Sequence, residues 1–288
     1  MGSPNHILII PDGGRRHARM QWLRNLFEKS PRKFRAALKK SLNKRDISSL
    51  EERIKEFSET GKDPQYLLDS KDLLYSNKIH VNVGYLIDSY KKGGEVLNTL
   101  IKYILKNDTC NVLSIYGLQK KNLERTEIEC FAMLEAEPEF FRKWARDEEI
   151  YSQCNFKFVG DREVFDLARR GLINGYLIDR FMDSADELER KSCGDKLKVY
   201  VLAPYDYEWE VNRAIVDGRF DPKRLVVKES VDLIIRCGNS RVPISGGIPI
   251  QVRDAQFTSV KKYFSDFTIG DFKEVLRGYD FEKGESGL

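Results

Sequence analysis

The N-terminal segment of this chain places a buried strand, a sharp turn and a helix in direct succession. The four apolar residues 7–10 predict the strand, because an uninterrupted apolar run of this length is typical of a fully buried strand. Residues 11–14, Pro-Asp-Gly-Gly, are a strong signal for a turn. Arg15 and Arg16 then begin a segment that we expect to be helical. This succession favours an α/β fold.

The same turn has the composition of a phosphate-binding site. Gly13 and Gly14 let backbone N–H groups approach a ligand, and the N-terminus of the helix is electropositive. The arginines pair with phosphate oxygens, and Asp12 supplies a carboxylate for an accompanying metal ion. An ordinary polar surface turn is the alternative, because short glycine motifs are weak signals by themselves.

Length and hydropathy restrict the class of protein. The chain has 288 residues, of which 41% are hydrophobic and 33% are charged, enough for one large α/β domain or two small ones. No apolar run approaches the roughly 20 residues that cross a bilayer. The N-terminus lacks the layout of a signal peptide.

Cysteines and net charge indicate the compartment and the partners. The five cysteines are scattered and form no CxxC pair, so we expect neither a disulfide framework nor a zinc site. This use of cysteine fits a reducing compartment, and we expect a cytoplasmic location. The net charge of +4 fits anionic substrates or peripheral contact with a membrane surface, and it gives no reason to expect nucleic acid.

The rest of the core alternates between predicted strands and helices. Apolar segments predict further strands at residues 112–116, 156–161, 198–202 and 233–236. Helical periodicity predicts helices at 94–106, directly after a glycine pair, and at 127–149 and 208–217. This alternation indicates a mostly parallel, doubly wound sheet. Ligands bind such sheets at the carboxyl ends of strands, where Asp12, the loop 117–125, Asp161 and Arg236 lie.

A helical insertion near 20–85 interrupts this pattern. The region is rich in Lys, Arg, Glu and Ser, and residues 31–43 and 48–59 have the periodicity of amphipathic helices. Their apolar stripes consist of Phe34, Leu38 and Leu42 on the first helix, and of Leu50, Ile54 and Phe57 on the second. We therefore expect one domain over residues 1–288, with the insertion inside it.

A second candidate anion site follows the strand at 233–236. Arg236 ends an otherwise apolar strand, where an unpaired charge would be costly. Arg241 and Ser245 follow in the next loop, and they add a second forked guanidinium and a hydroxyl. Two anion sites of different construction indicate an enzyme that joins two phosphorylated substrates.

Five motifs in order resemble those of the cis-prenyltransferases, the undecaprenyl diphosphate synthase family. Residues 11–18 are similar to its Asp-Gly-Asn-Gly-Arg-Trp-Ala motif, and residues 158–161 to Ile-Gly-Asp. Residues 114–125 resemble the loop segment that ends in Glu-Asn-Trp-x-Arg-Pro. Residues 232–245 resemble Asp-Leu-x-Ile-Arg-Thr-Gly-Gly-x-x-Arg-x-Ser, and residues 264–267 resemble Trp-Pro-Asp-Phe.

The resemblance implies a fold, a reaction and partners. The fold is a single α/β domain with a six-stranded, mostly parallel sheet flanked by helices, and the protein is expected to be a homodimer. The reaction is the condensation of an allylic prenyl diphosphate with isopentenyl (or dimethylallyl) diphosphate, with Mg²⁺ as cofactor. An apolar tunnel shields the carbocation from water, and the helix 94–106 is expected to contribute to its wall, although core packing is the alternative for its apolar residues.

The resemblance also implies roles for single residues. Asp12 is the pivotal magnesium and diphosphate residue, and Asp12, Arg16, Asn122 and Arg125 are the expected catalytic residues. The diphosphate-binding residues fall into two groups. They are Gly13, Gly14, Arg15 and Arg16 for the allylic substrate, and Arg236, Arg241 and Ser245 for isopentenyl diphosphate.

Several positions depart from the family pattern. The motif asparagine, second glycine and tryptophan correspond to Gly14, Arg15 and His17, and the loop tryptophan corresponds to Leu123. The carboxylate that completes the magnesium site corresponds to Gln256, and an amide is a much poorer ligand for a hard dication.

These departures leave three functions open. The first is an active transferase that makes a short, branched or cyclised product rather than a long polyprenyl chain. The second is a terpene cyclase acting on a single prenyl diphosphate. The third is a non-catalytic, prenyltransferase-like partner subunit. The retained Asp12 and arginines favour an enzyme.

Overall fold

A parallel sheet of six strands forms the centre of the computed structural model, which describes residues 3–39, 42–60, 81–165, 175–238, 248 and 250–279. The strand order is β3-β4-β2-β1-β7-β8, and every neighbouring pair is parallel. The strands are β1 (His6–Ile10), β2 (Val112–Tyr116), β3 (Cys154–Val159), β4 (Leu197–Leu202), β7 (Leu233–Cys237) and β8 (Gln256–Val260). The predicted α/β fold with a six-stranded sheet is confirmed.

The apolar runs that predicted the strands form a core on both faces of the sheet. Every residue of β1, β2 and β7 is buried. Because side chains alternate along a strand, Ile7 and Ile9 pack into the core on one face, and Leu8 and Ile10 pack into the core on the other. Burial on both faces is typical of parallel sheets and explains why apolar residues occupy consecutive positions in these strands instead of alternating with polar ones.

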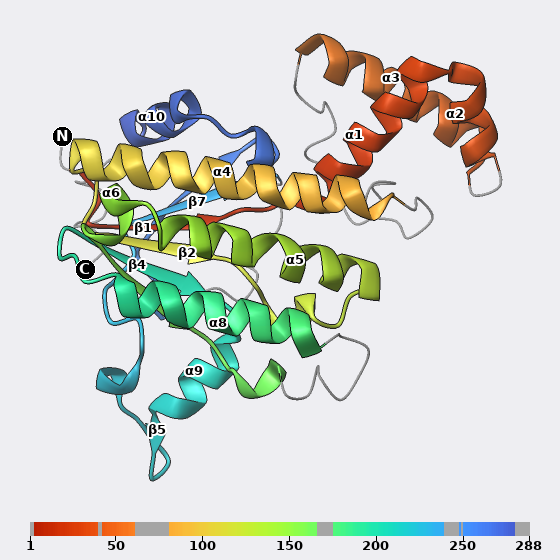
Figure 1. Ribbon diagram of the computed structural model, residues 1–288. Coiled ribbons are helices and arrows are strands. Elements are labelled where there is room, and N and C mark those ends of the chain that lie inside the picture. Colours follow the sequence, from red (N-terminus) through yellow and green to blue (C-terminus); the bar gives the residue numbers. More distant parts are fainter. Residues whose placement is uncertain are drawn as a thin grey trace.

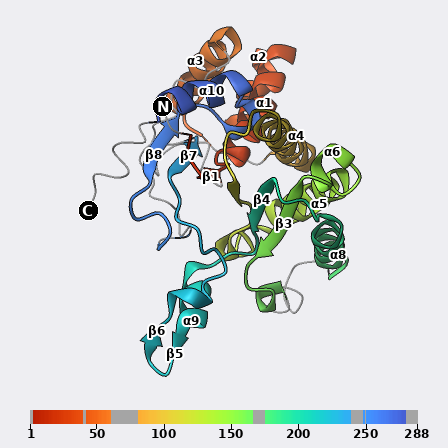
Figure 2. The same ribbon diagram turned by 90° about the vertical axis from the view of Figure 1, so that its left-hand side faces the viewer.

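Three long helices lie side by side over one face of the sheet (Figure 1). They are α4 (Val83–Asn107), α5 (Glu127–Trp144) and α8 (Gly175–Lys191). Figure 2 shows all three on the same side of the strands. The shorter elements are α6 (Glu148–Tyr151), α9 (Tyr207–Ala214), β5 (Ile215–Val216), β6 (Arg219–Phe220), α10 (Ile269–Arg277), and the 3-10 turns η1 (Lys120–Asn122), η2 (Pro222–Arg224) and η3 (Phe264–Asp266).

Helices α1 (Gly14–Lys29), α2 (Pro31–Leu38) and α3 (Lys44–Thr60) extend beyond one end of α4 (Figure 1). Ser30 separates the first two helices, because its side chain accepts a hydrogen bond from Lys33 N and Pro31 occupies the first helical position. The three helices surround a small core of their own. It contains Met20, Leu23, Phe34, Leu38, Leu42, Ile47, Leu50, Ile54, Phe57 and Tyr263. Both predicted helices are present, but the first ends at Leu38 rather than at residue 43, so Leu42 reaches this core from the segment after α2.

The predicted start of the helix at 94–106 is wrong. Helix α4 begins at Val83, where Asn82 accepts a hydrogen bond from Gly84 N, and it continues through both glycines of the pair. A Cβ at Gly94 would lie 2.2 Å from the ring of Phe140 in α5, so this glycine permits close packing of two helices. The helix predicted at 127–149 is also divided, because α5 ends at Trp144 and α6 follows it.

Among the residues that the structure describes, none of the helices has the length and apolar character that would let it cross a bilayer.

Candidate active site

The turn between β1 and α1 is built around a glycine in a left-handed conformation. Gly13 has φ of 99°, and its N–H donates a hydrogen bond of 2.6 Å to Asp12 Oδ1. A Cβ at this position would lie 2.6 Å from Tyr263 Cδ1. Both the backbone angle and the close approach of Tyr263 therefore require glycine. The turn directs the Asp12 carboxylate to the carboxyl end of the sheet.

Two buried arginines flank Asp12. Arg236 Nη2 lies 2.9 Å from Asp12 Oδ2, and Arg16 Nη2 lies 3.8 Å from Asp12 Oδ1. The side chains of Arg236 and Arg16 are 3% and 1% exposed, whereas that of Asp12 is 28% exposed. Arg236, the charge that ends an apolar strand, is therefore paired with Asp12. Asp12 thus contacts one arginine from each of the two predicted anion sites, Arg16 from the first and Arg236 from the second.

Arg16 is fixed by further contacts. Its Nη1 donates a hydrogen bond of 3.0 Å to Gly238 O, and its guanidinium lies 5.5 Å from the centre of the Tyr263 ring. Gly238 has φ of 90°, and a Cβ there would lie 2.7 Å from Arg16 Nη2. Sequence analysis did not assign this glycine a role. It lets the strand end approach the guanidinium closely.

A second charged group lies at the start of α5. Glu129 is buried, and its carboxylate lies 3.3 Å from Arg15 Nη1 and 3.6 Å from Arg19 Nη2. Arg125 is close to this group. Burial is the main cause that lowers the pKa of the Arg125 guanidinium, and the positive charge of Arg15 lowers it further. Glu129 was not predicted as a site residue. In the sequence it is only an acidic residue in the first turn of a predicted helix, a common position for one.

Asn122 shapes the loop that follows β2. It is buried at the end of η1, where Gln119 N donates a hydrogen bond of 2.9 Å to its Oδ1. The Asn122 and Gln119 side chains form a reciprocal cap, so the loop is ordered by its own residues. Asp161, two residues after the end of β3, accepts a hydrogen bond from Glu163 N and does not line the cavity described next.

A cavity of about 170 Å³ begins at this cluster and continues between α4 and α5. One part of its wall is polar and contains Asp12, Gly13, Gly14, Arg15, Arg16, Asn122 and Arg125. The other part is mostly apolar and contains Leu97, Met133, Phe140, Phe141 and Trp144. Among the apolar side chains predicted for the helix 94–106, Leu97 lines the cavity, whereas Leu100, Ile101 and Ile104 pack in the core. The structure thus places a charged site directly beside an apolar cavity.

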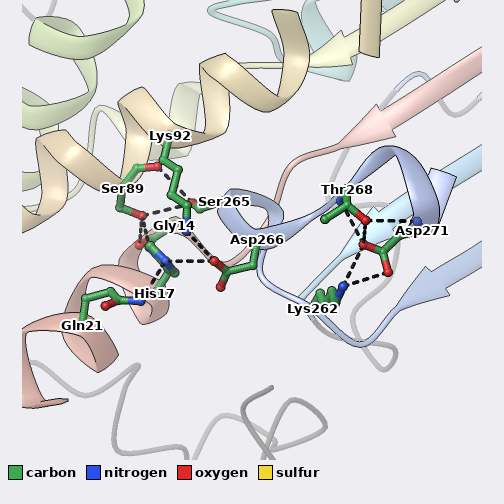
Figure 3. A network of polar contacts seen from close by, with 10 residues as sticks. All are labelled: Gly14, His17, Gln21, Ser89, Lys92, Lys262, Ser265, Asp266, Thr268 and Asp271. Atoms are coloured by element: carbon green, nitrogen blue, oxygen red, sulfur yellow. Dashed lines mark hydrogen bonds and ion pairs between the residues drawn. The ribbon is translucent and has the colours of Figure 1, made fainter. Parts of the chain in front are cut away.

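A hydrogen-bond network joins the turn between β1 and α1 to α4 and η3 (Figure 3). Ser89 Oγ of α4 donates a hydrogen bond of 2.8 Å to Gly14 O and lies 2.9 Å from His17 Nδ1. His17 Nε2 lies 3.5 Å from Asp266 Oδ1, which also accepts a hydrogen bond of 2.6 Å from Lys92 Nζ.

The charges of this network determine the ionisation of Asp266. Burial raises the pKa of its carboxyl, but the contacts with His17 and Lys92 outweigh burial and lower it overall. His17, at the position of the family's tryptophan, therefore connects α1 to α4 and η3.

One residue that the resemblance assigns to the magnesium site is not near Asp12. Gln256 begins β8 at the opposite end of the sheet, and its amide donates a hydrogen bond of 2.8 Å to Gly278 O. Arg241 and Ser245 lie outside the described residues. Among the described residues, no group of three or more His, Cys, Asp or Glu side chains is arranged to hold a metal ion.

Comparisons with known proteins agree with this architecture. The prenyltransferase family model that describes undecaprenyl diphosphate synthases matches residues 84–287, which is more than two thirds of the chain. No curated protein matches the sequence.

Solved structures of similar fold include the following two. Lavandulyl diphosphate synthase from Lavandula x intermedia, in complex with dimethylallyl diphosphate, has a TM-score of 0.59 and 17% identity, covering 96% of this chain and 95% of that one. A probable undecaprenyl diphosphate synthase from Campylobacter jejuni has a TM-score of 0.52 and 17% identity, covering 65% of this chain and 88% of that one.

Proposed function

Because this chain belongs to the undecaprenyl diphosphate synthase family and is a prenyltransferase, we propose that it condenses an allylic prenyl diphosphate with isopentenyl or dimethylallyl diphosphate to give a short product. One observation supports this above all. Asp12 lies between two buried arginines at the opening of a cavity that is mostly apolar farther in. A site of this kind holds a diphosphate at its charged end and a hydrocarbon at the other.

The residues of the site fit the charge changes of the reaction. When the allylic C–O bond breaks, its electron pair stays on the diphosphate and the carbon becomes a cation. Arg16 and Arg15 present guanidinium groups where the negative charge develops, and Asp12 fixes Arg16 and Arg236 in place. The double bond of the second substrate then attacks the cation, and loss of a proton completes the new chain. The apolar wall excludes water from the cation.

The residues present fit a magnesium ion that is shared with the substrate. Mg²⁺ usually binds one or two carboxylates, several waters and substrate phosphates rather than a cage of protein ligands alone. Asp12 supplies one partly exposed carboxylate at the cavity opening. When bound there, the ion would neutralise charge on the departing diphosphate.

The cavity volume supports a short product. A cavity of about 150 Å³ accommodates benzene, a molecule of six carbons. The cavity of about 170 Å³ therefore has room for about one five-carbon isoprenyl unit. Dimethylallyl diphosphate, the ligand of the lavandulyl diphosphate synthase structure, is accordingly the first allylic substrate to test. A homodimer and a cytoplasmic location complete the proposal.

Mass spectrometry of the products tests this function. We expect purified protein with Mg²⁺, isopentenyl diphosphate and dimethylallyl diphosphate to form a prenyl diphosphate of ten carbons, and Asp12→Asn to abolish it. A hydrocarbon or alcohol formed from one substrate alone would favour the terpene cyclase. Folded protein without turnover on any allylic diphosphate of five to fifteen carbons would leave the non-catalytic subunit as the explanation.

A further inference from the structure

One polar group stands out in the apolar wall of the cavity. Met133, Glu137, Phe140, Phe141 and Trp144 line it from one face of α5, and Glu137 is the acidic member of this set. Its carboxyl makes no hydrogen bond or ion pair within the described part of the chain. Burial raises the pKa of this carboxyl from 4.5 to about 8. A carboxyl without a partner is unusual in such surroundings.

Two further polar groups of the same cavity lack a partner. Tyr90 Oη and Trp144 Nε1 are buried and have no hydrogen-bond partner among the described residues. Tyr90 packs against the diphosphate end of the cavity, because its Cε1 lies 3.0 Å from where a Cβ of Gly14 would be. Tyr90 and Glu137 are also close enough to interact electrostatically. The polar groups therefore begin beside the glycine turn and continue along the cavity.

These groups discriminate between ligands. A purely hydrocarbon group that fills the cavity displaces water and leaves the carboxyl, the hydroxyl and the indole N–H unpaired. A ligand with an oxygen at the right depth restores hydrogen bonds. Sites that hydrogen-bond a substrate hydroxyl reject the analogue without it far more strongly than apolar pockets reject an added methylene.

We propose that the cavity binds a five-carbon allylic diphosphate whose hydrocarbon end bears a hydroxyl group, and that Glu137 and Tyr90 hydrogen-bond this hydroxyl. The inference rests on the proposed function, because it assumes that the diphosphate binds at Asp12, Arg15 and Arg16. The cavity of about 170 Å³ limits the hydrocarbon to about one isoprenyl unit. Glu137 thus determines specificity and takes no part in bond breaking.

Two ligands that differ by one oxygen test this proposal. Isothermal titration calorimetry compares (E)-4-hydroxy-3-methylbut-2-enyl diphosphate with dimethylallyl diphosphate in a buffer with Mg²⁺. We expect the hydroxylated ligand to bind at least tenfold more tightly. Glu137→Leu should abolish this preference, and Glu137→Gln should keep part of it because an amide still forms hydrogen bonds. Tyr90→Phe, which removes only the hydroxyl, should reduce the preference and gives a second measurement independent of Glu137.

Glu139→Leu is the matched control. Glu139 is on the same helix, but it is exposed and pairs with Lys91 at 2.9 Å on the surface, so its substitution should leave the preference intact. Equal affinity of the two ligands for the unmodified protein, as expected if water satisfies the polar groups, overturns the inference and leaves the proposed function standing. So does a preference that survives Glu137→Leu. Failure of both ligands to bind overturns the proposed function together with the inference.

Discussion

At the scale of single residues, the candidate site depends on polar groups in buried surroundings. Asp12 pairs with two arginines that are almost completely buried, so the charges of the proposed diphosphate site also stabilise one another. Glu137 is the opposite case, because burial raises the pKa of its carboxyl to about 8 and no described residue pairs with it. Protonation of the Glu137 carboxyl therefore affects the free energy of unfolding.

Replacement of Glu137 by glutamine should change how stability depends on pH. Below pH 4.5 the carboxyl is protonated in both the folded and the unfolded states, so the group has no effect on the pH dependence. Between 4.5 and about 8 the folded protein keeps the proton while the unfolded chain loses it, and the free energy of unfolding falls as pH rises. We expect Glu137→Gln to remove this decline.

Urea unfolding of both proteins across this window measures the difference. Carboxyls with lowered pKa values, such as Asp266 and Asp271, change the pH dependence of unfolding only below their ordinary pKa of 3.8, outside this window, and they are present in both proteins. A stability difference that does not change with pH would contradict the assigned protonation of Glu137.

At the scale of elements, close packing of α4 and α5 forms the cavity wall. Both glycines of the pair lie inside α4, where glycine is less favourable than alanine by about 1 kcal/mol. A Cβ at Gly94 would lie 2.2 Å from the Phe140 ring, whereas a Cβ at Gly93 would make an ordinary contact of 3.6 Å with Phe264 Cδ1. Position 94 therefore requires glycine, whereas position 93 has room for alanine.

The glycine pair gives a prediction with its own control. We expect Gly94→Ala to lower the free energy of unfolding by about 1–3 kcal/mol, because Phe140 must move. Gly93→Ala should raise it by about 0.5–1 kcal/mol through the improved helix propensity. Chemical denaturation measures both, and a similar change in the two variants would contradict the packing described here.

The elements that sequence analysis found are those with a clear pattern. Strand β1 and strand β7 are apolar over nearly their whole length, so composition alone predicts them. Strand β8 was not predicted because it lies at the sheet edge and none of its residues is fully buried. Its sequence therefore mixes polar and apolar residues and has neither an apolar run nor a regular alternation. The start of α4 was misplaced because a glycine needed for helix contact has the same sequence signal as a glycine at a helix end.

The site was predictable to a similar degree. Residues near one another in sequence, from Asp12 to Arg16, have a recognisable motif. The ion pair between Asp12 and Arg236 joins two strand ends that only the sheet order makes neighbours. Glu137 has no motif, because its significance arises from a cavity that two helices form together.

At the scale of the whole molecule, Tyr263 connects the α1–α3 helices to the candidate active site. It is fully buried in their core, and it also contacts Gly13 and lies beside the Arg16 guanidinium. The helical region and the sheet thus meet at the residues that hold Asp12. We propose that this junction, assembled from both ends of the chain, is a diphosphate site.

Calorimetric titration of dimethylallyl diphosphate in the presence of Mg²⁺ tests that claim most directly, with Arg16→Gln compared against Arg213→Gln. Arg16 lines the cavity beside Asp12, whereas Arg213 is an exposed arginine that stacks on Trp209 in α9. We predict that Arg16→Gln weakens binding at least tenfold, because a buried guanidinium facing the diphosphate is lost, and that Arg213→Gln leaves the affinity unchanged. Equal affinity of the folded Arg16→Gln variant and the unmodified protein would contradict the account.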